Sequence, residues 1–418
     1  MRTESGGRRA ESVSKDKLYP FRWPLDPPQK LDSPLGTALP IFKEIFGALS
    51  QDESSPFSRI SVANSSFSLD PFVGCPARCA YCVVGSSARD LDLTREVEKI
   101  VPTHPRRLFS GRELVNALVS HPGFIPNKSV ISIGTGSTES FLPDVEGETW
   151  EIIRTLSERG LRNPIWIVTK LGIPDNLIGL WTERFEYAVN ADIPIVFSVT
   201  YSAAPDWMEP YSGDRFRNAA KLRNAGVKLS HHYRPILQGV NSGPVDVSKA
   251  LQASLGLVDV ICIGGLRPDP GIQLIWEKVH GLEHRLLPHG PGKQLPAGFI
   301  DLVRQTVRAR GFATKVVNRS SEAISFLLDI PEFNLYRLRP EGEDGFLLLS
   351  PSMREKISAL HQGNSIEGLV ERAAESIGLY NITCVGDKDV VRLNRRLLYQ
   401  EHRLLIHALG HSGVLDGI

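Results

Sequence analysis

Three of the five cysteines in this 418-residue chain lie close together, at Cys75, Cys79 and Cys82. Thiolates are soft ligands that suit iron–sulfur clusters, zinc and Cu(I). With three and then two residues between them, the cysteines can surround one small inorganic group from a single loop. A cubane cluster held by three cysteines keeps one iron without a protein ligand, and that iron is open to a substrate or cofactor. The pattern therefore predicts a reactive metal centre.

The cysteines could instead hold a structural zinc ion or form disulfide bonds, but the sequence favours these two interpretations less. A structural zinc site requires a fourth ligand, usually Cys or His at a second short spacing. The chain has no second Cys-x-x-Cys, and the nearest downstream histidine is His104. Disulfides are disfavoured because five is an odd number and residues 1–16 lack the apolar stretch of a secretion signal. We expect a cytoplasmic, reducing setting, which also suits an oxygen-sensitive cluster.

The charges of the chain nearly balance. There are 48 Lys and Arg residues against 47 Asp and Glu residues, so the net charge is +1. This balance gives no global field that would attract nucleic acid, although it leaves room for a local basic patch. No apolar run reaches the length of a membrane span, so we expect no membrane association.

Composition divides the chain into four expected parts. Residues 1–16 form a disordered tail, and residues 17–58 form a proline-rich arm that packs across the main domain. Residues 59–330 form the core, and residues 331–418 form a small, mainly helical C-terminal domain. Within this last part the pattern predicts a strand and two helices, at Phe346–Leu349, Met353–His361 and Ser365–Ile377.

Strand-like and helix-like segments alternate through the expected core. Apolar, β-branched runs predict strands at Phe67–Val73, Ser129–Ile133, Pro164–Val168, Ile193–Thr200, Lys228–Tyr233 and Val258–Ile263. Helical periods between them include Gly111–Val119, Glu148–Arg159, Arg215–Ala225 and Val247–Leu255. This alternation indicates βαβ units and a parallel sheet. We expect an α/β fold, a partial (β/α)6 barrel, with the chemistry and the cysteine loop at the carboxyl ends of the strands.

The cysteine loop, with Tyr81 just before the last cysteine, resembles the signature loop of the radical S-adenosylmethionine (SAM) superfamily. The resemblance implies that the three cysteines bind three irons of a [4Fe-4S] cluster and that SAM chelates the fourth. It implies that Tyr81 packs near the adenine; packing under the loop is the other interpretation, and the two are compatible. The implied chemistry is reductive cleavage of SAM to a 5′-deoxyadenosyl radical, with an electron from a flavodoxin or ferredoxin.

Further stretches, in order over roughly residues 58–245, resemble the branch that includes spore photoproduct lyase. They are Leu69–Cys75, Gly136–Glu139, Ile167–Lys170, Phe197–Thr200, Glu209–Pro210 and Arg215–Gly226. The resemblance implies a SAM-binding role for several residues, namely Gly134, Gly136, Ser137, Thr138, Glu139, Lys170 and Ser198. Lys170 would pair with the SAM carboxylate, and Ser198 would bond the ribose or carboxylate. The alternatives are an ordinary strand-to-helix turn, a solvated lysine and a serine that satisfies neighbouring backbone.

One position departs from the lyase pattern. In the photoproduct lyases, a cysteine near the end of the second strand returns a hydrogen atom to the substrate. Gly136 stands at the matching position here, so repair of thymine photoproducts is not expected from this residue. Cys262 is the candidate replacement donor, and the alternative is a buried core cysteine.

The fifth predicted strand ends with residues that can bind an acidic substrate. Side chains alternate along a strand, so either His231 and Tyr233 or His232 and Arg234 face the barrel interior. An Arg or His there can bind a carboxylate or phosphate.

The C-terminal part loosely resembles winged-helix peptide-binding domains of peptide-modifying radical SAM enzymes. A leucine-bearing helix is predicted to carry Arg392, Arg395, Arg396, Arg403, His402 and His407. We expect a peptide or secondary metabolite as substrate. A nucleic-acid base, modified or repaired, is the alternative, and a non-catalytic metal-binding adaptor is an alternative of another class.

Overall fold

The structure is a computed structural model that describes most of the core and parts of the C-terminal region. The described residues are 55–62, 66–77, 79–82, 104–121, 123–136, 138–209, 213–266, 272, 295–330, 337–339, 346–348, 365–379, 383–387, 390–393, 404–405 and 407–409. The predictions for the tail 1–16, for nearly all of the arm 17–58, for the helix Met353–His361 and for Ser137 lie outside these residues.

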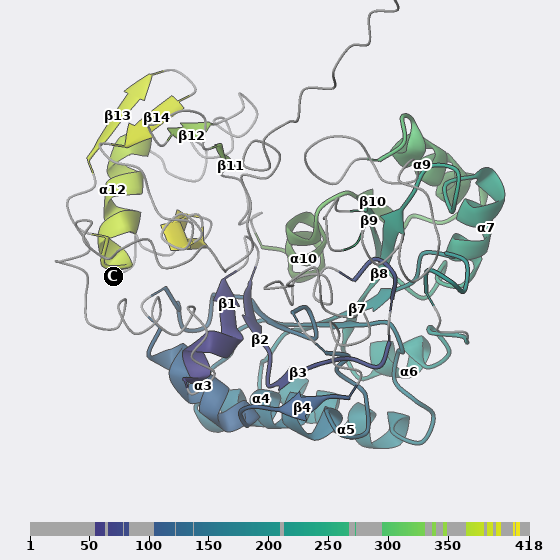
Figure 1. The fold of residues 1–418 in the computed structure, drawn as a ribbon, viewed down its shortest axis with the longest axis horizontal. Coiled ribbons are helices and arrows are strands. Elements are labelled where there is room, and N and C mark those ends of the chain that lie inside the picture. The colour runs from purple at the N-terminus through teal and green to yellow at the C-terminus, as the bar shows by residue number, and fades with distance from the viewer. Residues whose placement is uncertain are drawn as a thin grey trace, which may run out of the picture.

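One large sheet dominates the described residues (Figure 1). Its strands, in spatial order, are β1 (Ile60–Val62), β2 (Phe67–Leu69), β5 (Ile131–Ile133), β6 (Ile165–Thr169), β7 (Ile195–Thr200), β8 (Lys228–Ile236), β9 (Val260–Gly265) and β10 (Lys315–Val317). Strand β1 pairs antiparallel with β2, and the following neighbours all pair in parallel. Sequential parallel order produces the open, curved sheet of a partial barrel. The sequence predicts six parallel strands, and the described residues add a seventh, β10, that was not predicted.

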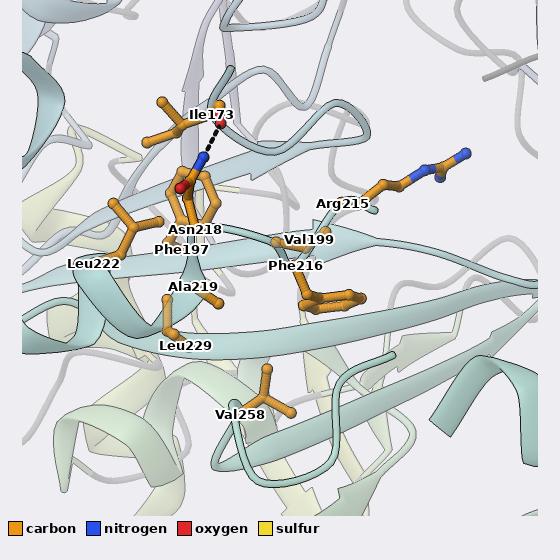
Figure 2. A pocket seen from close by; sticks show the side chains of 10 residues that line it. All are labelled: Ile173, Phe197, Val199, Arg215, Phe216, Asn218, Ala219, Leu222, Leu229 and Val258. Atoms are coloured by element: carbon orange, nitrogen blue, oxygen red, sulfur yellow. Dashed lines mark hydrogen bonds between the residues drawn. The ribbon is translucent and has the colours of Figure 1, made fainter. Parts of the chain in front are cut away.

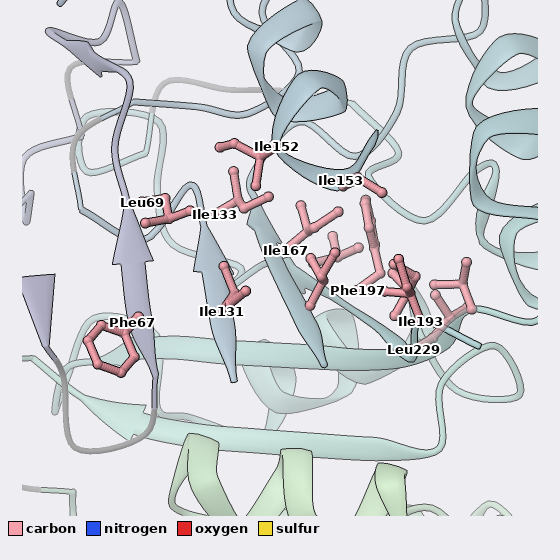
Figure 3. Close-up of a cluster of buried hydrophobic side chains, with 14 of the residues drawn as sticks. Phe67, Leu69, Ile131, Ile133, Ile152, Ile153, Ile167, Ile193, Phe197 and Leu229 are labelled. Atoms are coloured by element: carbon pink, nitrogen blue, oxygen red, sulfur yellow. The ribbon is translucent and has the colours of Figure 1, made fainter. Parts of the chain in front are cut away.

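Helices connect the parallel strands and cover the outer face of the sheet. They are α3 (Gly111–Val119), α4 (Glu146–Glu158), α5 (Ile178–Asn190), α6 (Ala219–Asn224), α7 (Pro244–Gln252) and α9 (Phe299–Ala309). In Figure 3, Ile152 and Ile153 of α4 lie over Ile133 and Ile167 of the sheet. Burial of such apolar side chains contributes about 1.5–3 kcal/mol per residue, so this layer fixes the curvature and register of the strands.

Helix α10 (Ser320–Leu328) covers the opposite, concave face, and Figure 1 shows strands of the sheet beside it and below it. Its buried apolar residues pack against Val130, which precedes β5, and against inward-facing strand residues, namely Trp166, Val196, Val260 and Cys262. The helix begins three residues after β10 ends, and its Phe326 ring lies 4.3 Å from the ammonium of Lys315, the first residue of β10. Helix α10 therefore runs back from the carboxyl ends toward the amino ends of the strands.

The described C-terminal residues form a second, antiparallel sheet. It contains β11 (Arg337–Arg339), β12 (Phe346–Leu348), β14 (Val390–Leu393) and β13 (Cys384–Asp387), in that order, beside α12 (Ile366–Ser376). The prediction of a mainly helical domain includes β12, at Phe346–Leu349, but omits the other three strands of this sheet. Arg392 lies in β14 and not on the predicted helix. Its neighbours Val390, Val391 and Leu393 explain the difference, since β-branched and alternating apolar residues favour a strand.

The end of the C-terminal region returns to the main sheet. Helical residues 404–405 and 407–409 share the main hydrophobic core with β2. The His407 Nε2 atom lies 2.8 Å from Ser129 Oγ, and its ring packs edge-on against Phe67 at the start of β2. These contacts lie at the amino ends of the strands. Among the described residues, no helix has the length and apolar character needed to cross a bilayer.

Candidate functional site

The cysteine loop lies at the carboxyl ends of the parallel strands, as predicted. After β2 the chain passes through Asp70 and Pro71 into β3 (Phe72–Val73), which pairs with β4 (Arg106–Arg107). Gly74 then has a φ of +94°, which L side chains rarely adopt, and this turn leads directly to Cys75. The loop packs against residues that follow β8 and β9, including Leu237 and Leu266.

The three thiols of the loop differ in burial and do not converge on one point. In the described part of the chain, no three His, Cys, Asp or Glu side chains converge closely enough to hold one metal ion. A [4Fe-4S] cluster does not require such convergence, because each thiolate binds a different iron. Cys79 is buried, while Cys75 and Cys82 are partly exposed. Three soft thiolate donors on one loop, one buried and two partly exposed, are the kind of ligands that an iron–sulfur cluster takes, and their binding to a cluster stays a prediction.

Lys170 connects the end of β6 to this loop. Its Nζ atom lies 3.1 Å from Cys79 Sγ and 4.2 Å from the centre of the Tyr81 ring. Burial lowers the pKa of Lys170, but the anionic forms of Tyr81, Cys79 and Glu209 outweigh burial and raise the pKa well above its usual value. Burial raises the pKa of the Cys79 thiol, and the Lys170 ammonium partly opposes this rise. Lys170 is thus a fixed cation beside the loop and not a solvated lysine. Its pairing with a SAM carboxylate stays a prediction.

A buried hydrogen-bond network fixes the position of Tyr81. The Tyr81 hydroxyl donates to Glu209 Oε1 at 2.5 Å, and Arg215 Nη1 donates to the same oxygen at 2.9 Å. Ser202 Oγ donates to the other carboxylate oxygen of Glu209, and Arg215 also donates to the Thr200 carbonyl oxygen. The phenol of Tyr81 therefore packs under the loop, which is one of the two roles expected for it, while a contact with adenine stays a prediction.

The turn after β5 is close-packed against the cysteine loop. Thr138 Oγ1 donates to the Gly74 carbonyl oxygen at 2.6 Å. Gly134 has a φ of +76°, and a Cβ atom there would overlap Ser140 Oγ. The carboxylate of Glu139 accepts hydrogen bonds from the Thr169 hydroxyl and the Lys170 backbone N–H. These residues join the turn, β6 and the loop into one unit, although their contacts with SAM stay predictions.

Asp70 explains why glycine is required at position 136. The Gly136 backbone N–H donates to Asp70 Oδ1 at 3.1 Å, and Ser68 Oγ donates to Oδ2 at 3.0 Å. A Cβ atom at Gly136 would overlap this carboxylate. A cysteine cannot enter this position while Asp70 keeps its place. Asp70 has no role in the sequence prediction, and its signal is only its position between the first strand and the cysteines.

Ser198 and Cys262 lie in the middle of their strands, and not at the carboxyl ends where the cysteine loop lies. Ser198 Oγ accepts from Trp166 Nε1 at 2.8 Å and lies 2.6 Å from Ser230 Oγ. Its hydroxyl is therefore occupied within the protein, whereas Thr200 lies two residues nearer the carboxyl end of the same strand face. Cys262 is completely buried against α10. This environment corresponds to the core-cysteine alternative, and the hydrogen-donor role stays a prediction.

The alternation of side chains along β8 decides which of the two predicted residue pairs faces the concave side of the sheet. His232 and Arg234 face the concave side, where the His232 ring packs edge-on to Trp166. His231 and Tyr233 face the helices. His231 Nδ1 lies 2.8 Å from Ser254 Oγ, and Nε2 lies 2.6 Å from the Tyr201 carbonyl oxygen. Burial lowers the pKa of His231 to about 4.

A small cavity on the outer face of the sheet does not belong to this site. It lies between β7, β8 and residues 215–222 and is lined mainly by apolar core side chains (Figure 2). Asn218 closes part of it through a hydrogen bond from Nδ2 to the Ile173 carbonyl oxygen. In Figure 2 the Arg215 guanidinium points away from these side chains. The cavity is therefore a packing gap between sheet and helices, away from the cysteines.

Two solved structures are weakly similar to this chain. No family model matches the chain, and no curated protein matches it. The crystal structure of Streptococcus suis SuiB bound to S-adenosylmethionine is similar over 60% of this chain and 50% of that chain, with 10% identity and a TM-score of 0.37. A second crystal structure of Streptococcus suis SuiB covers 65% of this chain and 54% of that chain, with 8% identity and a TM-score of 0.38. The chain thus spans about half the length of SuiB, and scores this low carry no argument about function.

Proposed function

We propose that this protein is a radical SAM enzyme of the spore photoproduct lyase-like branch. Cys75, Cys79 and Cys82 bind a [4Fe-4S] cluster, and the Gly134–Glu139 turn and Lys170 bind SAM. The observation that carries the proposal is the direct contact of this turn and of Lys170 with the cysteine loop, at the carboxyl ends of a parallel sheet. Ligand sites of parallel α/β folds lie at this edge.

Each group of the chain has a defined task in this proposal. The cluster and SAM supply reductive cleavage to a 5′-deoxyadenosyl radical that abstracts a substrate hydrogen, with the electron coming from a flavodoxin or ferredoxin. Glu209 and Arg215 keep Tyr81 under the loop, and Tyr81 in turn supports Lys170. Lys170 places a positive charge beside Cys79, where it offsets negative charge on a cluster thiolate.

The substrate that we propose is a peptide or secondary metabolite, modified in the cytoplasm. A nucleic-acid base is the alternative, and it predicts oligonucleotide binding that weakens steeply with salt. Asp70, which fills the place of the lyase cysteine side chain, argues against repair of thymine photoproducts by a cysteine at position 136.

Anaerobic reconstitution with iron and sulfide tests the function. The wild-type protein is expected to gain visible cluster absorption and to form 5′-deoxyadenosine from SAM when dithionite is added. Cys79→Ala is expected to lose both, because it removes a thiolate ligand. Cys384→Ala is the matched control, since Cys384 lies in β13 of the C-terminal sheet, and it is expected to keep both.

Metal analysis separates the proposal from its rivals. Iron and sulfide in about equal amounts support the cluster. One zinc per chain and no deoxyadenosine would instead establish the non-catalytic adaptor. Retention of SAM cleavage by Cys79→Ala would remove the assignment of the cluster to this loop.

A further inference from the structure

Arg234 is a cation on the concave face of the sheet whose described partners are all neutral. Its Nη2 atom lies 2.8 Å from His232 Nδ1, 2.8 Å from Ser320 Oγ and 3.8 Å from Cys262 Sγ. Within the described residues, no carboxylate lies within ion-pair distance of it. The contrast with Arg215 is direct, because that buried guanidinium is paired with Glu209 at 2.9 Å.

An unpaired guanidinium inside a fold is costly unless something else compensates its charge. Arg234 is partly exposed on the concave side of the sheet, so a bound molecule can reach it. The hydrogen bonds that it makes to described residues all use Nη2 and leave the donors on Nε and Nη1. A planar guanidinium with donors remaining matches the two oxygens of a carboxylate or phosphate.

The surrounding backbone holds this side chain in a defined place. Gly264 on β9 provides the necessary space, because a Cβ atom there would lie 3.3 Å from Arg234 Cδ and crowd it. Ser320, which contacts Nη2, is the first residue of α10. The amino end of a helix carries a partial positive charge, so it adds to the attraction of Arg234 for an anion.

We propose that Arg234 binds an anionic group, carboxylate or phosphate, of the substrate. This inference rests on the proposed function and adds a substrate class to it. The predicted SAM contacts follow β5 and β6 or lie on β7, whereas Arg234 lies on β8 and turns toward β9 and α10. The anion therefore belongs to the second reactant, and His232 and Ser320 position the guanidinium that receives it.

Calorimetric titration of the reconstituted, unreduced protein with inorganic phosphate and with succinate tests the proposal. Without a reductant no SAM is consumed, so the same titration is made with and without SAM. Saturable binding of at least one anion to the wild-type protein is expected in both conditions. Arg234→Gln is expected to bind that anion at least tenfold more weakly, and Arg234→Lys to lie between the two because it keeps the charge and loses the planar donors.

Arg162→Gln is the matched control, since Arg162 is exposed and precedes β6 at the other end of the sheet. It is expected to bind the anion like the wild-type protein. Thermal unfolding checks the fold of each variant. If Arg234→Gln does not fold, then Ser320→Ala, which removes only a hydroxyl that contacts Nη2, replaces it and is expected to weaken binding severalfold.

Three outcomes overturn the proposal. They are the absence of saturable anion binding to the wild-type protein, equal binding by the wild-type protein and the Arg234 variants, and a competition in which SAM displaces the anion and Arg234→Gln weakens SAM itself tenfold. The last result would assign Arg234 to the SAM carboxylate. Failure of cluster assembly would remove the proposed function but not the heat of anion binding, so the two failures are distinguishable.

Discussion

His231 is a buried residue whose environment makes the stability of the protein depend on pH. It is completely buried among the rings of Tyr201, Phe216 and Tyr233, and both of its ring nitrogens have protein partners. The neutral ring can donate from one nitrogen and accept at the other, which suits a hydroxyl and a carbonyl oxygen. Protonation would place an unpaired charge in this apolar layer, and burial therefore lowers the pKa of His231 to about 4.

We predict that the free energy of unfolding falls as the pH decreases from about 6.5 to about 4. In this range the unfolded chain binds a proton at His231 and the folded chain does not, so acid favours unfolding. Complete titration of this group corresponds to about 3 kcal/mol, at about 1.4 kcal/mol per unit of pKa difference. Urea unfolding of the wild-type protein and of His231→Gln at several pH values measures the effect.

The variant is expected to lose less stability over the same pH range, because glutamine does not titrate. Its unfolding at pH 7 gives the reference for any packing defect. Parallel pH profiles for the two proteins would show that His231 is not the responsible group.

At the scale of the element, the turn after β5 depends on one close approach. Asp70, between β2 and β3, accepts the backbone N–H of Gly136, and the two segments leave no room for a side chain at position 136. The contact fixes where β2 ends relative to β5. It therefore also fixes the position of the cysteine loop relative to the predicted SAM turn.

We predict that Gly136→Ala lowers the free energy of unfolding by about 1–3 kcal/mol, the usual cost of overpacking. Asp70→Gly creates the missing space, so the double variant is expected to be more stable than the sum of the two single effects implies. Urea unfolding of the four proteins measures this coupling. Gly147→Ala, with open space around the new methyl group, is the control and is expected to gain about 0.4–1 kcal/mol. Additive effects in the cycle would contradict a direct contact.

Most strands of the core can be predicted because their residues are apolar on both faces, as in Ile193–Thr200. Two elements show the limits of such patterns. The predicted strand Phe67–Val73 is two strands, because Pro71 has no N–H for a sheet ladder. Strand β10 has only three residues, fewer than the four that make a recognisable run.

The candidate site shows the same limits. The cysteines are recognisable from local spacing, whereas the Tyr81–Glu209 contact joins residues 128 positions apart. Sequence places Glu209 and Arg215 in a family-like stretch, but only the fold shows that they form a buried pair. Roles that depend on such distant pairing leave no periodic signal in one sequence.

At the scale of the whole molecule, the C-terminal region and the main sheet share one hydrophobic core. Leu404 and Leu405 are buried in the cluster that contains Phe67, and His407 contacts Ser129. A leucine truncated in such a core costs about 2–5 kcal/mol. Because Leu404 contacts main-core residues, its loss should affect the sheet and not only the C-terminal region.

We predict that Leu404→Ala lowers the urea midpoint of the main sheet, followed by the fluorescence of the buried Trp166 and Trp181. Leu180→Ala is the control, since that leucine is 43% exposed and its loss is expected to change stability by less than about 0.5 kcal/mol. An unchanged fluorescence midpoint in Leu404→Ala, with a separate transition in circular dichroism, would show that the two regions unfold independently.

Helix α10 has a consequence for the direction from which a reactant approaches the concave face. Because it fills the concave face from Ser320 toward the amino ends of the strands, a molecule reaches Arg234 from the side of the cysteine loop. SAM is proposed to bind beside that same loop. The reactant that contacts Arg234 and SAM are therefore expected to approach from the same edge of the sheet, the carboxyl ends of the strands, where the proposed radical forms.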